Sequence, residues 1–195
     1  MKQLQDKKRE LTILNGKRPI PMDWTNPDKT FNSESPEVKN HNGNGGYVTR
    51  ANKVVFDFDD RAVYEEEKNK FPETYTVQTG GEKNGVHVYV DTEEPVEKIV
   101  LQDEAGNHIG EIQADGQQVV IEGSIHPKTG KRYEVLIDAP IATILTEVYD
   151  YFKKKYTKEK IVRDVNWNNY QTSSIGSQIR IESLFDMGKL KLLSN

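Results

Sequence analysis

One apolar run that ends in paired carboxylates constrains the fold of this chain more than any other feature. Residues 53–60 read Lys-Val-Val-Phe-Asp-Phe-Asp-Asp, and their β-branched and aromatic side chains favour a strand. Because successive side chains of a strand point to opposite faces, Asp57 and Asp59 share one face. Phe56 and Phe58 lie on the other. Two carboxylates held side by side usually share a proton or bind a cation, so the run predicts a strand with a cation site on one face.

Composition narrows the chemistry that this site can use. The chain has 195 residues, enough for one substantial core or for two small lobes that share one. It has no cysteine, which excludes disulfides, thiolate zinc sites and thiol nucleophiles, so a metal must be held by carboxylate, imidazole or water. The net charge of -4 argues against non-specific coating of nucleic acid but allows a local basic groove. No apolar run is long enough to cross a bilayer and no signal peptide is evident, so we expect a cytoplasmic protein without a membrane partner.

Apolar runs, turn residues and helix formers predict short strands and two main helices. The strand at 54–59 is expected to form a hairpin with residues 47–49. A second hairpin is expected where Ala114-Asp115-Gly116 separates two apolar runs. Helices are predicted at 61–71 and at 141–156, where apolar residues recur with helical spacing. Further strands are predicted at 75–78, 86–90, 98–101 and 135–137, and marginal helices at 179–185 and 189–193.

A basic segment with two prolines follows a turn near the N-terminus. Asn15-Gly16 predicts the turn, and the prolines rule out a regular helix in the residues that follow. Composition favours an extended connector in which Trp24 is a packing anchor. The alternative is that Lys17 and Arg18 form a basic pair aimed at a phosphate group.

Two loops carry groups that suit an anion. The glycine loop, residues 79–85, contains three glycines and Lys83 between two strands, so its backbone N–H groups can approach an anion closely. His87 follows in the second of these strands. A lone strand histidine is more often a structural hydrogen-bonding group, but the preceding loop favours a binding role here. The Ser-Ile-His loop, residues 123–134, combines a hydroxyl, an imidazole and several basic side chains.

In the order of these motifs, the chain resembles the primase-polymerase (prim-pol) domains of the archaeo-eukaryotic primase superfamily. The resemblance is particularly to those in replication proteins of archaeal plasmids and viruses. The paired carboxylates, the glycine loop followed by a histidine, an acidic strand residue before a glycine turn, and a Ser-x-His-Pro loop all stand in the order of that family's motifs. The resemblance covers roughly residues 10 to 150. The matching segments are Val55-Phe56-Asp57-Phe58-Asp59, Thr79-Gly80-Gly81 through Gly85-Val86-His87, Glu111-Ile112-Gln113 with Gly116, Gly123-Ser124-Ile125-His126-Pro127 with Gly130 and Tyr133, and, near the start, Lys17, Pro19 and Trp24.

The resemblance implies an α+β fold, in which a catalytic sheet like that of the RNA-recognition motif (RRM) packs with a smaller N-terminal α/β lobe. It assigns residues 1–157 to the prim-pol catalytic domain and leaves 158–195 as a C-terminal helical tail or the start of a connector. In the family, such a connector leads to a helical region and a helicase. A fused or associated helicase is therefore an expected partner.

For function, the resemblance implies a DNA primase and DNA polymerase that acts in replication by template-directed transfer of nucleotides from nucleoside triphosphates to a 3′-hydroxyl. Two Mg²⁺ or Mn²⁺ ions in such a site stabilise the attacking and leaving oxygens, and hard carboxylate ligands suit both metals. The implied catalytic residues and metal ligands are Asp57, Asp59 and Glu111. Expected substrates are a single-stranded DNA template, a primer strand and nucleoside triphosphates. The expected nucleotide-binding residues are above all His87, and then Thr79, Lys83, Ser124, His126 and Arg132.

Two other functions and two other carboxylates are the alternatives. A haloacid-dehalogenase-like phosphatase would use Asp57 as nucleophile and Asp59 as acid and base, although Asp60-Arg61 stand where that family has glycine and threonine. A non-catalytic nucleic-acid-binding module of replication would have no need for paired carboxylates. Asp60 points away from Asp59 and Asp115 lies in a turn, so both are expected to be solvated or to form turns.

Overall fold

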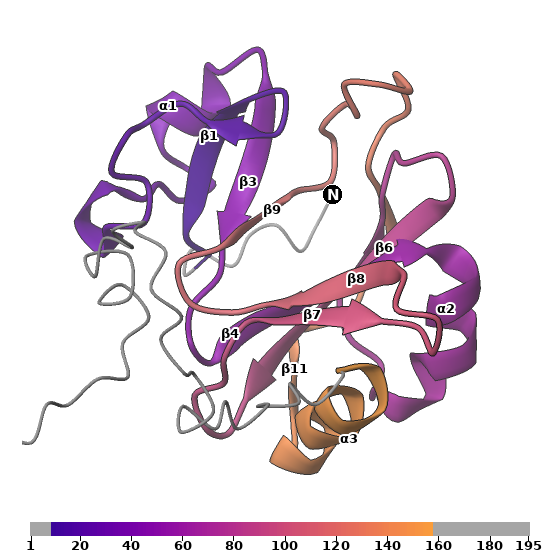
Figure 1. Cartoon of the computed structure of the whole chain (residues 1–195). Coiled ribbons are helices and arrows are strands. Elements are labelled where there is room, and N and C mark those ends of the chain that lie inside the picture. Colours follow the sequence, from indigo (N-terminus) through magenta and orange to yellow (C-terminus); the bar gives the residue numbers. More distant parts are fainter. Residues whose placement is uncertain (1–8, 158–195) are drawn as a thin grey trace, which may run out of the picture. The chain divides into compact units, whose positions relative to one another are not determined.

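Residues 9–157 are described by a computed structural model, in which they form a mixed α+β structure with two mainly antiparallel sheets (Figure 1). The small sheet has the strand order β2-β1-β3-β9, so its last strand comes from far along the chain. Its strands are β1 (Leu11–Asn15), β2 (Arg18–Pro19), β3 (Asn44–Val48) and β9 (Gln118–Val120). Two short helices lie between β2 and β3, namely η1 (Pro27–Lys29) and α1 (Pro36–Lys39).

The large sheet is built around β4 (Lys53–Asp60), which pairs with β6 (Asn84–Thr92) on one side and with β8 (His108–Gln113) on the other. Its strand order is β10-β5-β6-β4-β8-β7, and β11 joins β6 in parallel. The remaining strands are β5 (Thr76–Gln78), β7 (Ile99–Gln102), β10 (Glu134–Ile137) and β11 (Ala142–Ile144). The helices are α2 (Arg61–Glu67), the 3₁₀ turn η2 (Lys68–Lys70) and α3 (Thr146–Tyr156).

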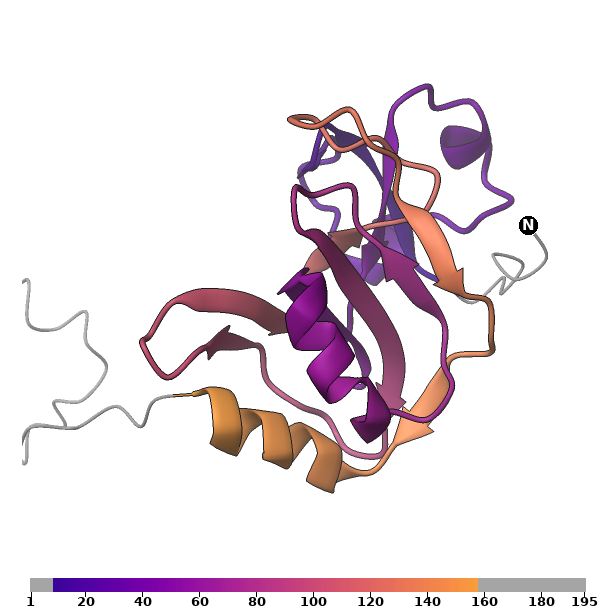
Figure 2. The same ribbon diagram turned by 90° about the vertical axis from the view of Figure 1, so that its right-hand side faces the viewer.

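The alternation of side chains along β4 gives the two faces of the large sheet different partners. Phe56 and Phe58 are fully buried in a core shared with α2 and α3, where Phe152 of α3 contacts both rings. Figure 2 shows α2 and α3 against the large sheet. Val55 points to the opposite face and packs in a second core with Leu14 of the small sheet. The small sheet therefore covers the face of β4 that also carries the paired carboxylates.

A buried arginine lies in the second core, where side chains from both sheets meet. The Arg9 guanidinium stands 5.0 Å from the ring centres of Tyr47 and Tyr75 and 4.9 Å from that of Tyr89. Glu122 pairs with the same guanidinium at 3.7 Å. Tyr47 belongs to the small sheet and Tyr89 to the large sheet, so these cation–π contacts join the two sheets.

Both predicted hairpins are wrong, because the two strands of each belong to different sheets. The strand at 44–48 pairs with β1 and β9 rather than with β4. Likewise, β8 pairs with β4 in the large sheet, whereas β9 pairs with β3 in the small sheet. The tight turn before β9 does form, with Gly116 at a φ of +69°. The two connections run side by side instead: Thr49 donates its backbone N–H to the Gln117 carbonyl at 2.9 Å, and its hydroxyl bonds the Ala114 carbonyl.

The helix predicted at 141–156 is shorter than its apolar periodicity suggests. Residues 142–144 form β11 beside β6, so α3 begins only at Thr146. Backbone pairing with the edge of β6 satisfies more buried N–H and C=O groups than one further helical turn would. None of the helices in residues 9–157 is long and apolar enough to cross a membrane. The tail at 158–195, with its predicted helices, lies outside the described residues.

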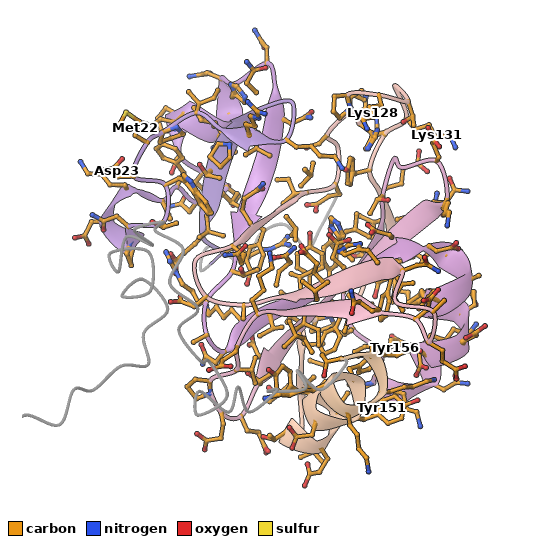
Figure 3. All side chains as sticks on the ribbon, viewed as in Figure 1. Met22, Asp23, Lys128, Lys131, Tyr151 and Tyr156 are labelled. Carbon is orange, nitrogen blue, oxygen red and sulfur yellow. The ribbon has the colours of Figure 1, made fainter. Side chains whose placement is uncertain are left out.

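Together α2 and η2 confirm the helix predicted at 61–71, and α2 carries a buried acid that contacts α3. Glu67 is 1% exposed, and its Oε1 accepts hydrogen bonds from the hydroxyls of Tyr156 at 2.6 Å and Tyr151 at 3.3 Å (both labelled in Figure 3). Lys155 forms an ion pair with the same oxygen. Burial raises the pKa of Glu67, but the hydrogen bonds from Lys155 and Tyr156 outweigh burial and hold that pKa below its ordinary value.

We expect Glu67→Gln to lower the free energy of unfolding near neutral pH by about 1–3 kcal/mol, because the substitution leaves buried donors without their anion. Since the folded-state pKa is lowered, this contribution is fully present above the unfolded-state value of 4.5 and is lost as the pH falls below it. Urea unfolding of both proteins near neutral pH and in acid measures the difference, which should shrink in acid. The exposed neighbour Glu66, changed to Gln, serves as control. A difference that is equal at both pH values would contradict the assigned role.

Candidate active site

Three adjacent strands of the large sheet bring together site residues that are far apart in the sequence. Asp57 on β4 lies opposite His87 on β6 and opposite Glu111 on β8. Asp59 follows Asp57 on the same face of β4. Exposure of the side chain rises from 24% at Asp57 to 54% at Asp59, whereas Val55 just before them is fully buried. Asp57, Asp59, His87 and Glu111, called the carboxylate face below, thus lie where the cover of the small sheet ends.

Asp57 and His87 form the most enclosed pair of the carboxylate face. Nε2 of His87 lies 3.2 Å from Oδ1 of Asp57, while Nδ1 is buried without a hydrogen-bond partner among residues 9–157. Burial raises the pKa of Asp57, but the charge and the hydrogen bond of His87 outweigh burial, so the pKa lies below its ordinary value. The Tyr133 ring stands 5.9 Å from the His87 ring, and burial together with the Asp57 charge raises the pKa of the Tyr133 hydroxyl. At neutral pH Asp57 is therefore an anion and Tyr133 is protonated.

Asp59 and Glu111 lie beside two basic side chains, His108 and Lys98, that the sequence patterns did not single out. Nδ1 of His108 lies 2.8 Å from Asp59 Oδ2, and its Nε2 lies 3.9 Å from Glu111 Oε1. Lys98 reaches Glu111 Oε1 at 3.2 Å, and Gln113 donates a hydrogen bond to the other oxygen. In a regular strand, His108 and Glu111 would point to opposite faces. An irregularity in the pairing of β7 with β8 lets both reach the carboxylate face, and no alternation rule signals that irregularity.

The three carboxylates fit a hard divalent cation by the chemistry of their donors. Oxygen ligands suit Mg²⁺ and Mn²⁺, and Asp57, Asp59 and Glu111 share one face of the sheet. Among residues 9–157, no three acidic or histidine side chains already surround a common point. His108 and Lys98 contact the carboxylate oxygens instead. Metal binding therefore requires the side chains of Asp59 and Glu111 to turn away from these basic side chains, which their partial exposure allows.

The two predicted anion-binding loops pack against each other beside the carboxylate face. Thr129 donates its hydroxyl to the Gly80 carbonyl at 2.5 Å, which joins the Ser-Ile-His loop to the glycine loop. A Cβ at position 80 would come within 2.5 Å of the Lys131 carbonyl oxygen and 2.7 Å of the His126 Cβ, so this close approach requires glycine. Figure 3 labels Lys131 on the protruding part of the Ser-Ile-His loop. The sequence placed these loops in one site, and the fold brings them into contact.

His126 of the Ser-Ile-His loop and Thr79 of the glycine loop are buried. The His126 ring stands 6.2 Å from the ring of Tyr133, which in turn contacts His87. Burial, together with the charge of Lys17, lowers the pKa of His126. Nδ1 of this neutral imidazole accepts from a backbone N–H at 3.3 Å, so the proton is on Nε2 and available to a ligand. Thr79 is 9% exposed, and its hydroxyl accepts from the backbone of its own loop at 3.3 Å.

Ser124, Arg132 and Lys83 already use their polar groups within the fold. The Ser124 hydroxyl accepts from the Gly45 N–H at 3.1 Å, so it joins the Ser-Ile-His loop to β3. Arg132 donates to a backbone carbonyl of its own loop at 2.5 Å. Lys83 pairs with Asp60 at 3.1 Å, but its side chain is 70% exposed and free to change partner. Of these three predicted nucleotide ligands, Lys83 is therefore the one whose side chain can most readily turn to a ligand.

The rival carboxylates have other surroundings. Asp60 caps α2, since its carboxylate accepts from the Ala62 N–H at 2.9 Å, and Asp115 is exposed in the turn before β9. After α2 and η2, the described chain continues through β5 to β11 without another helix before α3. The alternating strands and helices that the phosphatase interpretation needs are therefore not found in residues 9–157.

Comparison with known families agrees with the geometry of the site. The family model described as "Bifunctional DNA primase/polymerase, N-terminal" matches residues 10–145. No curated protein matches the chain. The matched residues make up more than half of the chain and include the whole carboxylate face, the glycine loop and the Ser-Ile-His loop. The chain belongs to the Prim-Pol family of N-terminal domains of bifunctional DNA primase/polymerases.

Proposed function

We propose that this domain catalyses template-directed nucleotidyl transfer, in which the α-phosphorus of a nucleoside triphosphate is joined to the 3′-hydroxyl of a primer strand and pyrophosphate is released. Membership of the Prim-Pol family implies DNA primase and polymerase activity. One observation carries the proposal: Asp57, His87 and Glu111 meet on three adjacent strands where one sheet face becomes open. The substrates are single-stranded DNA template, primer strand and nucleoside triphosphates, and a fused or associated helicase is a proposed partner.

Asp57, Asp59 and Glu111 are the proposed catalytic residues and would hold Mg²⁺ or Mn²⁺. Two such ions, when bound, stabilise the attacking and leaving oxygens of an in-line displacement. Because the pKa of Asp57 is already lowered, this carboxylate needs to lose no proton before it binds a cation. Gln113 orients Glu111 through its hydrogen bond and limits the rotamers that Glu111 can adopt.

His87 and the two packed loops are the proposed triphosphate site. The rings of His87 and His126 both lie beside the Tyr133 ring, and Thr79 lies at the start of the glycine loop. Lys83 would join them by leaving Asp60. Ser124 and Arg132 support the site by fixing the Ser-Ile-His loop. That loop can then offer its backbone N–H groups to phosphate oxygens.

The large sheet is proposed to be the RRM-like catalytic sheet, and the small sheet the N-terminal lobe. The succession β4, α2, β5, β6 follows the first four elements of a β-α-β-β-α-β unit. Strand β7 stands before β8, where that unit has its second helix. The carboxylate face lies on the side of the sheet opposite α2, so the helix supports β4 without blocking access to the site.

His87→Ala is expected to weaken the binding of a nucleoside triphosphate by about tenfold or more, because one charge-assisted hydrogen bond is lost. Titration calorimetry with a non-hydrolysable deoxynucleoside triphosphate and Mg²⁺ measures the affinity. His41→Ala is the matched control, since the His41 ring bonds the Leu14 carbonyl within the small sheet. An unchanged affinity in His87→Ala would remove this histidine from the site.

The activity itself is tested with primed and unprimed single-stranded DNA, labelled nucleotides and either Mg²⁺ or Mn²⁺, followed by sizing of the products. Extension of the primer or synthesis of short chains supports the proposal. Hydrolysis of phosphomonoesters without extension would favour the phosphatase alternative. Tight DNA binding that needs neither metal nor nucleotide, again without extension, would favour the non-catalytic module.

A further inference from the structure

The turn between β1 and β2 brings a lysine of the small sheet beside the Ser-Ile-His loop, which carries His126. Gly16 and Lys17 form the two-residue loop of this hairpin, between the paired residues Asn15 and Arg18. Gly16 has a φ of +62°, which suits a tight hairpin loop. A Cβ built on Gly16 would stand 3.9 Å from the Cβ of Pro127, so the loop lies against the Ser-Ile-His loop. The basic pair predicted from the sequence is thus on a hairpin tip rather than on an extended connector.

Asn44 on β3 holds this hairpin tip against the Ser-Ile-His loop. Its Nδ2 donates to the Gly16 carbonyl at 2.8 Å and to the Ile125 carbonyl at 2.7 Å, and its Oδ1 accepts from the Ile125 N–H at 2.8 Å. Asn44 is only 8% exposed, so these hydrogen bonds are shielded from water. Gln118 adds another by donating to the Lys17 carbonyl at 3.0 Å. The backbone is fixed at both tip residues, while the Lys17 side chain is exposed.

Lys17 stands beside the part of the Ser-Ile-His loop that carries His126. The hairpin tip lies against Pro127, the residue after His126, and, after burial, the Lys17 charge contributes to lowering the pKa of His126. The exposed Lys17 side chain can therefore reach a ligand that is bound at His126. A lysine serves as a mobile point charge for phosphate oxygens, whose negative charge a site lined by three carboxylates would otherwise repel.

We propose that Lys17 binds a terminal phosphate of the nucleoside triphosphate, and that Asn44 is the positioning residue that keeps the Lys17 turn beside His126. The inference rests on the proposed function and adds the small sheet to the nucleotide site. The ligand would then contact Lys17 of the small sheet as well as His87 of the large sheet.

Lys17→Gln tests the phosphate contact, because it removes the charge and keeps the length of the side chain. Calorimetric titration with a non-hydrolysable deoxynucleoside triphosphate and Mg²⁺ should give about tenfold weaker binding, with most of the affinity restored in Lys17→Arg. Binding of the corresponding monophosphate should change less than about twofold, since it lacks the terminal phosphates. Lys154→Gln on the exposed side of α3 controls for the loss of one positive charge.

Single-stranded DNA, the other source of phosphate groups, is titrated into the same variants. DNA affinity should fall no further in Lys17→Gln than in Lys154→Gln. The proposal is overturned if wild type and Lys17→Gln bind the triphosphate equally, or if the loss is confined to DNA. A wild-type protein that binds no triphosphate at all would instead overturn the proposed function, and this inference with it.

Asn44→Ala tests the positioning role. If Asn44 acts through Lys17, the loss of triphosphate affinity caused by Asn44→Ala should largely disappear in the Lys17→Gln background. Additive losses would overturn the positioning role, because a general loosening of the fold weakens binding with or without the lysine charge. Gln118→Ala is the milder variant for the same cycle, since it removes only the hydrogen bond to the Lys17 carbonyl.

Discussion

Replacing Asp57 by Asn is expected to reduce primer extension by about 10²- to 10³-fold or more, while the protein stays folded. Asp57 is the central carboxylate of the carboxylate face, with Glu111 opposite it on one side and His87 on the other. The amide keeps the shape of the side chain but removes the anion that would hold a divalent cation. Initial rates on one fixed primer and template, with Mg²⁺ or Mn²⁺ in excess, measure the loss.

The control for this result is Asp115→Asn, which removes the same charge from an exposed turn and should leave extension unchanged. Urea unfolding of both variants shows whether any loss comes from the fold. Because the pKa of Asp57 is lowered by its pair with His87, the amide should lower the free energy of unfolding by about 1–3 kcal/mol, which is small compared with the loss of activity. Extension at the wild-type rate by folded Asp57→Asn would falsify its assignment as a catalytic residue.

The substitution Phe56→Ala, at the neighbouring residue, is expected to affect stability rather than catalysis. It should lower the free energy of unfolding by about 3–5 kcal/mol. Phe56 is fully buried, and its ring centre lies 4.9 Å from that of Phe71 and 5.0 Å from that of Phe152. The alanine leaves a cavity between β4 and α3 that these rings can fill only in part. Urea unfolding, with wild type under the same conditions, measures the change.

Phe56→Leu is the matched variant, since it keeps most of the buried volume and should cost clearly less than the alanine. Folded Phe56→Leu should extend primers at a rate close to that of wild type, because the side chain at position 56 points away from the carboxylate face. A stability loss below about 1 kcal/mol in Phe56→Ala would contradict the assigned packing. We therefore expect substitutions at two adjacent residues of β4 to have different effects: Asp57→Asn on catalysis and Phe56→Ala on stability.

Local rules were sufficient for the central strand and its carboxylates. The alternation in residues 53–60 predicted that Asp57 would face one way and Phe56 the other, and β4 has this arrangement. The order of the motifs identified the family that the comparison then confirmed over residues 10–145. The helix after β4 was also found, because its residues are helix formers, whereas the capping of this helix by Asp60 was not predicted.

Rules that depend on nearest neighbours failed where tertiary pairing decided the outcome. Turn residues around Arg50-Ala51-Asn52 and around Asp115-Gly116 look the same whether the following strand stays in its sheet or leaves it. The periodicity of residues 141–156 could not reveal that β6 offers a free edge for β11. His108 lies close to the carboxylates because the pairing of β7 with β8 shifts its register, and Lys98 because β7 pairs with β8; contacts between strands of this kind have no local signature.

The position of β9 at the edge of the small sheet has a consequence for the order in which the chain can fold. Strand β3 pairs with β9 through Gly46 and Val120, so the sheet that begins at Leu11 is closed only by a strand more than a hundred residues later. During synthesis on the ribosome, the edge of β3 that β9 later occupies stays unpaired until the strands from β4 to β8 have emerged. Contacts of such large sequence separation slow folding, and the small sheet is complete only when β9 has joined it. A chain truncated before residue 118 would accordingly expose the β3 edge to pairing with other copies, and aggregation is its expected fate.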